Sequence, residues 1–279
     1  MKLLRTPETI EEAVNRLKAQ KRKFTIRHGT YTDTLVFGDQ KIAFSHARFS
    51  NRVFAAANMI RRDVEASALG QAIIRGDYEK TNFNHRENLQ PVFARRALNI
   101  DITSAYARCL FANGLITPDT YNYMLRLRKH ERLPAAGMLA RGFTLYHYEG
   151  GQCVKVEPYR APTAQVFYYL IAEINNVMMA LEWELGSYFY FYWVDGIFFR
   201  YDTPKNLVTR CENIIADRGY EFKYESVENF RLTKHDDLYT IRMTKNGEPK
   251  QYQFTDSATG KEIQRMLYGT QKENYKPQP

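Results

Sequence analysis

The segment that most constrains how this chain can fold is residues 187–201, SYFYFYWVDGIFFRY, in which one acid interrupts two runs of aromatic and aliphatic residues. The acid is Asp195, and Gly196 follows it. Asp-Gly between two such runs strongly predicts a β-hairpin, because a tight turn needs a positive φ that Gly adopts readily and Asp tolerates. We therefore expect a turn at Asp195-Gly196 that holds one carboxylate at a hairpin tip. Turn chemistry alone also explains an acid at this position.

A second acid, Asp101, follows another strand-like run. Leu98, Ile100 and Ile102 alternate as the buried face of a half-buried strand, so Asp101 faces the other way. Two acids on neighbouring strands can hold a pair of divalent ions roughly 3.5 to 4 Å apart. Mg²⁺ suits such a site because it prefers oxygen ligands and keeps substrate phosphates in its coordination shell, with Mn²⁺ as the alternative. Asp101 and Asp195 are therefore the candidate metal ligands.

The elements between and after the two acids indicate an α+β fold. A long helix over 163–185 carries one apolar stripe and ends at Gly186, directly before the hairpin. A helix over 204–217 and a strand over 220–227 follow. The order of elements fits an antiparallel sheet backed by helices: a strand, a helical insertion, a long helix, the acid-tipped hairpin, a helix and a strand. This is the layout of a polymerase palm.

The flanking segments give further elements. The pattern predicts a three-stranded meander over 23–44, a helix over 51–74 divided near Gly70, and a polar loop over 76–91. It also predicts a helix from Thr117 that Pro134 breaks or kinks, hairpins over 142–156 and 239–254, a short helix through Ile263 and Leu267, and a disordered tail over 271–279. We divide the chain into an N-terminal α/β region (1–90), a palm (91–230) with a small insertion (114–160), and a C-terminal hairpin and helix (231–270).

The charge of the chain favours an anionic partner. Lys and Arg total 40 against 31 Asp and Glu, a formal net charge of +9, and the 20 Tyr and 17 Phe offer aromatic faces that can stack on bases. Many basic proteins, however, are only soluble and basic. Three scattered cysteines indicate neither a disulfide framework nor a zinc site. Because no apolar run approaches the ~20 residues that span a bilayer, we expect a soluble cytoplasmic protein with no membrane partner.

Residues 101–106, Asp-Ile-Thr-Ser-Ala-Tyr, resemble the first palm motif of the family B DNA polymerases, which reads Asp, two variable residues, Ser, a variable residue and Tyr. The resemblance covers residues 95–243. It implies a polymerase-type palm with very small fingers and a short thumb-like C-terminal part, in a minimal enzyme of the phage or mobile-element type.

The hairpin carries the second part of the resemblance. Residues 190–196, YFYWVDG, are similar to the Tyr-x-Asp-Thr-Asp-Ser hairpin of the same family, and Asp195 matches its second, metal-binding Asp. Trp193 stands where the family has its first Asp, while Val194 and Gly196 replace Thr and Ser. The hairpin is thus a degenerate form of the family motif.

The resemblance implies a role for each matching residue. Asp101 and Asp195 would bind both ions, with help from the Ile102 carbonyl group. Ser104 would lie near the triphosphate. Tyr106 would pack under the sugar and exclude a ribose 2′-hydroxyl group.

Basic residues outside these two motifs complete the prediction. Lys129 and Arg132 lie in a loose counterpart of the fingers motif and could clamp triphosphate oxygens, the alternative being a solvated helix face. Lys234 and Tyr239, in KHDDLY, occupy the place of the Lys-x-Tyr element that touches the primer duplex in the family.

The predicted function is that of a template-directed DNA polymerase, a nucleotidyltransferase that adds deoxynucleotides to a primer by two-metal-ion catalysis. Its partners would be a DNA primer-template, deoxynucleoside triphosphates and other replication proteins, in the host cytoplasm for a phage enzyme. The alternatives are a catalytically degenerate palm that binds nucleic acid or a replication partner, a primase or terminal transferase, and a nuclease, since carboxylate pairs also hydrolyse phosphodiesters.

A proofreading exonuclease is not expected. Residues 63–65, Asp-Val-Glu, have the acid-x-acid pattern of such a site, but they lie in a helix-like stretch shortly before Asp101. We interpret them as a helix surface.

Overall fold

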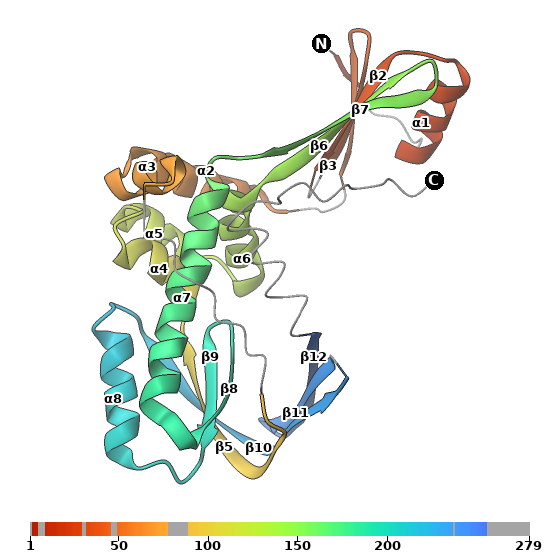
Figure 1. Ribbon diagram of the computed structural model, residues 1–279. Helices are drawn as coiled ribbons and strands as arrows, with labels where there is room; N and C mark the ends of the chain where they lie inside the picture. The colour runs from red at the N-terminus through yellow and green to blue at the C-terminus, as the bar shows by residue number, and fades with distance from the viewer. Residues whose placement is uncertain are drawn as a thin grey trace.

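The computed structural model of the chain describes residues 2–4, 9–29, 32–45, 49–77, 89–236 and 238–255. These residues form an α+β fold in which two six-stranded sheets lie at opposite ends of the molecule and a group of helices lies between them (Figure 1). The α+β class and the antiparallel sheet backed by helices are therefore confirmed.

One sheet carries both predicted acids. Its strand order is β12-β11-β10-β5-β9-β8, and every neighbouring pair is antiparallel. The strands are β5 (Val92–Ile102), β8 (Phe189–Trp193), β9 (Gly196–Arg200), β10 (Phe222–His235), β11 (Leu238–Lys245) and β12 (Glu248–Thr255). The hairpin predicted over 239–254 is β11–β12, and it continues this sheet.

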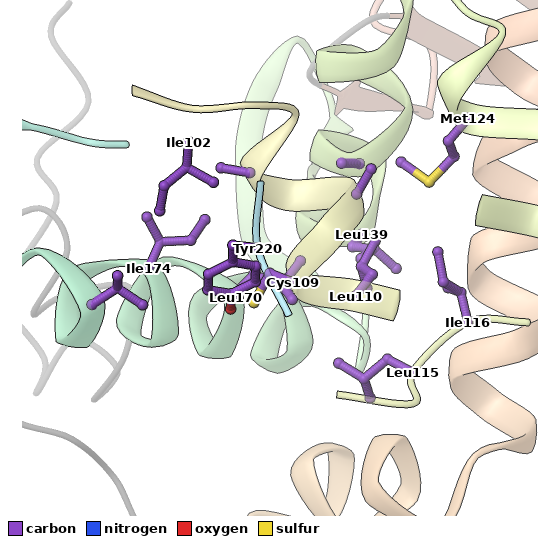
Figure 2. Close-up of a cluster of buried hydrophobic side chains, with 14 of the residues drawn as sticks. Ile102, Cys109, Leu110, Leu115, Ile116, Met124, Leu139, Leu170, Ile174 and Tyr220 are labelled. Carbon is purple, nitrogen blue, oxygen red and sulfur yellow. The ribbon is translucent and has the colours of Figure 1, made fainter. Parts of the chain in front are cut away.

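Helices cover one face of that sheet, because alternate residues of its central strands are apolar. The helices are α4 (Ala105–Ala112), α7 (Ala164–Leu185) and α8 (Lys205–Ala216), and η2 (Gly186–Tyr188) links α7 to β8. Ile100 and Ile102 are fully buried against them. Figure 2 shows how Leu170 and Ile174 of α7 meet Ile102, Cys109 and Tyr220 in this core. The apolar stripe of the long helix is thus core, as predicted.

The opposite face of the sheet is only partly covered. A second apolar cluster, which includes Phe191, Phe198, Phe230 and Tyr239, lies on this face and takes residues from β5, β8, β9, β10 and β11. Asp101 lies on this face at the carboxyl end of β5, beside the turn that joins β8 to β9.

The second sheet combines distant parts of the sequence. Its order is β1-β4-β3-β2-β6-β7, antiparallel except for the parallel β1–β4 pair. The elements are β1 (Lys2–Leu4), α1 (Ile10–Ala19), β2 (Phe24–Gly29), β3 (Thr32–Phe37), β4 (Gln40–Ser45), β6 (Gly142–Glu149) and β7 (Gln152–Arg160). The predicted meander is β2–β4, and the hairpin expected within the insertion adds two strands to it (Figure 1).

The remaining helices form the layer between the sheets. They are α2 (Asn51–Ala66), α3 (Ala68–Arg75), α5 (Pro118–Leu125), α6 (Lys129–Gly137) and the short η1 (Met138–Ala140). The helix predicted over 51–74 divides at Ser67, which caps α3, rather than at Gly70. Pro134 lies inside α6, and the break between the two helices falls earlier, at 126–128.

The interpretation of residues 63–65 as a helix surface is wrong for Asp63 and Val64, whereas Glu65 is exposed on α2. Asp63 is buried and accepts hydrogen bonds from the Thr117 backbone N–H (3.0 Å), the Thr117 hydroxyl (2.6 Å) and the Thr120 hydroxyl (2.5 Å). Val64 is also buried. Asp63 therefore joins α2 to the start of α5.

The turn of the acid-tipped hairpin also differs from the prediction. Trp193 pairs with Gly196, so Val194 and Asp195 form the turn and Gly196 already belongs to β9. The positive φ of 51° falls on Val194. A β-branched residue in this region is strained, typically by about 1 to 3 kcal/mol.

Three predicted segments lie wholly or largely outside the described residues. They are the polar loop over 76–91, the helix through Ile263 and Leu267, and the tail over 271–279. Among the described helices, none combines the length and the apolar character needed to cross a membrane.

Candidate active site

Seven of the nine residues predicted for a site line one cavity of about 170 Å³ at the carboxyl end of β5. The seven are Asp101, Ile102, Ser104, Tyr106, Lys129, Arg132 and Asp195. They come from β5, from α4 and the turn before it, from α6, and from the β8–β9 turn. The fold therefore brings together residues that lie up to 94 positions apart in the sequence.

Asp101 lies on the open face of the sheet. It pairs with Gly196 of β9 on one side and with Lys223 of β10 on the other. The ammonium group of Lys223 is 3.2 Å from Asp101 Oδ2 and 2.8 Å from Glu225 Oε1. Sequence reasoning missed Lys223, because a strand was predicted at 220–227 but its register against β5 was not.

Asp195 is held beside Asp101 by the backbone. The Ile102 N–H donates to the Asp195 carbonyl oxygen (2.8 Å), which ties the turn to the end of β5. Partial burial and then the negative charge of Asp101 raise the pKa of Asp195 to about 6, against an ordinary value of 3.8, while Lys129 and Lys223 partly oppose this. A carboxylate pair that resists full ionisation is a suitable place for a cation.

Gly196 permits the close approach of the two strands. A Cβ at this position would lie 3.3 Å from Asp101 Oδ1 and 3.3 Å from Asn99 Oδ1. Any side chain would press on the carboxylate, so Gly196 is needed for space and not for its φ. The buried Asn99 Oδ1 has no hydrogen-bond partner in the described part of the chain, and Asn99 was not predicted as a site residue.

Trp193 lies across the hairpin from Gly196 and is 41% exposed. Its ring stacks on Phe191, with centroids 6.2 Å apart. Because it pairs directly with Gly196, the side chain belongs to the same face as Asp101. An aromatic ring thus occupies the position at which a further acid would face the pair.

Two cations come from α6. Lys129 and Arg132 are three residues apart and share one face of this helix. Arg132 Nη1 donates to the Ser104 hydroxyl (2.7 Å), and Ser104 has left-handed backbone dihedrals (φ 56°, ψ 43°) at the start of α4. The helix is anchored to the start of α2, where the Ser50 hydroxyl donates to Glu131 Oε1 (2.8 Å).

Tyr106 closes the inner side of the cavity. Its ring stacks on Phe167 of α7, with centroids 5.7 Å apart and planes at 16°. Burial, and then the charge of Asp195, raise the pKa of its hydroxyl group to about 12. The hydroxyl is therefore neutral at physiological pH, and the ring is a fixed wall.

Lys234 and Tyr239 are not among the residues that line the cavity. They pair with each other across β10 and β11, and the Lys234 ammonium group lies 5.0 Å from the centre of the Tyr239 ring. Tyr239 is fully buried in the second apolar cluster, so its ring is not available to touch nucleic acid. Lys234 is exposed, and its contact with nucleic acid stays a prediction.

The described residues contain no cluster of three or more His, Cys, Asp and Glu side chains arranged as a metal site. The cavity thus offers two carboxylates and backbone carbonyl groups. In comparisons with known proteins, no family model and no curated protein sequence matches this chain. Any function must therefore be inferred from the residues and their geometry.

Proposed function

We propose that this protein is a template-directed DNA polymerase with a minimal, family B-like palm, which transfers deoxynucleotides to a primer. The observation that carries the proposal is the cavity at the end of β5, where two acids, three cations and a fixed tyrosine ring converge. Both kinds of charge match the substrate: the acids suit the metal ions that enter with a nucleoside triphosphate, and the cations suit its phosphate groups.

The residues present fit a divalent cation. Asp101 and Asp195 are hard oxygen donors; burial and then the charge of Asp101 keep the pKa of Asp195 high, and a cation between the two carboxylates would relieve their repulsion. The unpartnered Asn99 Oδ1 adds another oxygen beside Asp101. Such ions activate the attacking oxygen and stabilise the departing phosphate. We propose Mg²⁺ as the physiological ion, with Mn²⁺ as a substitute.

The surrounding cations would orient the triphosphate. Lys129 is exposed at the cavity and Arg132 is already directed by the Ser104 hydroxyl group, so both could bind phosphate oxygens, Arg132 in a bidentate manner. Positioning and neutralisation of charge supply most of the catalysis in phosphoryl transfer. Tyr106, fixed on Phe167, would lie under the sugar and disfavour a ribose 2′-hydroxyl group.

Primer extension tests this proposal. The parent protein should extend a labelled DNA primer on a template with Mg²⁺ or Mn²⁺ and should prefer deoxynucleotides to ribonucleotides. Asp101→Asn and Asp195→Asn should each lower the rate at least a hundredfold, because each removes a metal ligand. Asp202→Asn is the matched control, since Asp202 is exposed at the far end of β9 and pairs with Arg200. Full activity in both site variants would disprove the proposal.

A second candidate is a palm that binds nucleic acid without synthesis. The observation that favours it is Trp193, which lies on the same face of the sheet as Asp101. The family hairpin has an acid at this position, so this site has two acids instead of three. This candidate predicts binding of nucleic acid with a steep dependence on salt and no incorporation of nucleotides with either metal ion.

A further inference from the structure

A groove lies between the second sheet, β1-β4-β3-β2-β6-β7, here called the N-terminal sheet, and the layer of helices between the two sheets. Neither Asp101 nor Asp195 lines it. It is a cavity of about 470 Å³ to which β2, β3, β4, α2, η1 and the β6–β7 hairpin all contribute. We infer that this groove is a binding site for single-stranded nucleic acid. Binding itself does not depend on the proposed catalysis; only the identification of the bound strand as the template rests on it.

The charges in the groove favour a polyanion. Four cations line it, namely Arg27, Lys41, Arg61 and Arg141, and no carboxylate does so among the described residues. None of the four has an ion-pair partner in the described part of the chain. Cations on protein surfaces are usually interspersed with acids, so four unpaired ones in a concave site indicate a ligand that carries several negative charges.

The rings in the groove favour unpaired bases. Phe54 of α2 is 42% exposed and Tyr159 of β7 is 48% exposed. Tyr159 stacks on Phe143, with centroids 4.5 Å apart, and the Arg27 guanidinium group lies 3.9 Å from the centre of the Phe143 ring on β6. Exposed rings beside cations are the means by which proteins bind single strands, because every base has a face that stacks. A duplex hides those faces and would leave the rings unused.

The groove continues along the hairpin. A second cavity of about 480 Å³ shares Phe143 and Tyr159 with the first and adds Arg160. The two cavities form one path that follows the β6–β7 hairpin, which Figure 1 shows reaching from the helical layer to the N-terminal sheet. An elongated path suits a strand of several nucleotides better than one compact ligand.

The groove and the candidate active site are joined by one short helix. The face of α6 that carries Lys129 and Arg132 lines the active-site cavity, and η1, directly after α6, lines the groove with Met138 and Leu139. Nine helical residues span about 13 Å. A strand bound in the groove could therefore reach the two acids, as an unpaired template must.

Fluorescence anisotropy tests the inference. A labelled oligo(dT) of about 20 nucleotides is titrated with the full chain in EDTA, which removes metal chemistry from the measurement. Lys41→Gln combined with Arg61→Gln should weaken binding at least tenfold and make the slope of log K against log salt shallower by about 1.4, since each lost contact to a single strand contributes about 0.7. Lys205→Gln combined with Arg218→Gln is the control, because it removes the same charge from α8 and the turn after it, at the opposite end of the molecule (Figure 1).

A second variant tests stacking. Phe54→Ala should weaken binding roughly fivefold to a hundredfold with an unchanged salt slope, because stacking, and not charge, is lost. Circular dichroism confirms that each variant is folded. Equal affinity of the groove and control double variants, or of the Phe54→Ala and parent proteins, would overturn the inference.

Competing ligands and the proposed function are separated in the same assay. A duplex or a polyglutamate that binds as tightly as oligo(dT) would overturn the assignment to single strands, whereas oligo(rU) reports whether the sugar matters. A protein that binds oligo(dT) in the groove but extends no primer upholds the inference and refutes the polymerase; extension without groove binding does the reverse.

Discussion

Asp195 is the residue whose structural environment bears most directly on the proposed chemistry. It lies in a strained turn, beside a second acid, and its pKa is raised to about 6 by burial and by Asp101. In the metal-free protein an ionised Asp195 therefore opposes folding. The same property would favour a divalent cation, because binding the ion replaces repulsion between carboxylates with attraction.

Removing this carboxylate should stabilise the metal-free protein in a pH-dependent way. Because the pKa is about 6 in the folded chain and 3.8 in the unfolded one, the destabilisation is complete well above pH 6, declines as the pH falls, and vanishes below 3.8. We expect Asp195→Asn to raise the free energy of unfolding by up to about 3 kcal/mol at pH 8, and by less than about 1 kcal/mol near pH 4.

Urea unfolding in EDTA at pH 8, 6 and 4.5 measures this gain. Asp202→Asn, at an exposed acid paired with Arg200, should show no such gain. A stabilisation by Asp195→Asn that does not change with pH would contradict the raised pKa.

At the scale of elements, the contact between α2 and α5 holds the helical layer together. Asp63 is buried between them, and its pKa is lowered to about 2, because hydrogen bonds from Thr117 and Thr120 outweigh the effect of burial. Asp63 accepts from the hydroxyl groups of Thr117 and Thr120 and from the Thr117 backbone N–H, so it pairs these donors at the start of α5. This acid therefore stabilises the layer to which α6 and its cations belong.

Loss of Asp63 should therefore be costly. We expect Asp63→Ala to lower the free energy of unfolding by about 2 to 4 kcal/mol at pH 7, because it leaves buried donors unpaired. Glu65→Ala, at an exposed position of the same helix, should change it by less than about 0.5 kcal/mol. The stabilisation by Asp63 should be complete above pH 4 and fall as the pH approaches 2. Equal effects of the two variants in urea unfolding would refute this role.

The elements differ in how well the sequence predicted them. The long helix ending before Gly186 and the hairpins followed from apolar periodicity and turn residues, which act locally. The turn shifted by one residue because the register of β8 against β9 outweighs the preference of Gly196 for a positive φ. Lys223 escaped prediction because its pairing with Asp101 depends on a register that no local pattern reveals. The burial of Asp63 depends in the same way on a partner that lies 54 residues later.

The whole molecule has two polar regions joined by a helical layer. One is the pair of acids at the end of β5, and the other is the basic groove against the N-terminal sheet. The sequence predicted most residues of the first region because they are clustered in motifs, although it missed Lys223. It did not predict the second, since that groove forms only when the β6–β7 hairpin joins β2, more than a hundred residues earlier in the chain.

Binding of Mn²⁺ followed by electron paramagnetic resonance tests most directly whether Asp101 and Asp195 form one cation site. We predict that the parent protein binds Mn²⁺, that Mg²⁺ displaces it, and that Asp101→Asn and Asp195→Asn each weaken binding at least tenfold, because each removes a direct ligand. Asp202→Asn should bind as the parent does. Equal Mn²⁺ affinity in the parent protein and both site variants would contradict a metal site at these two acids, and with it the proposed chemistry.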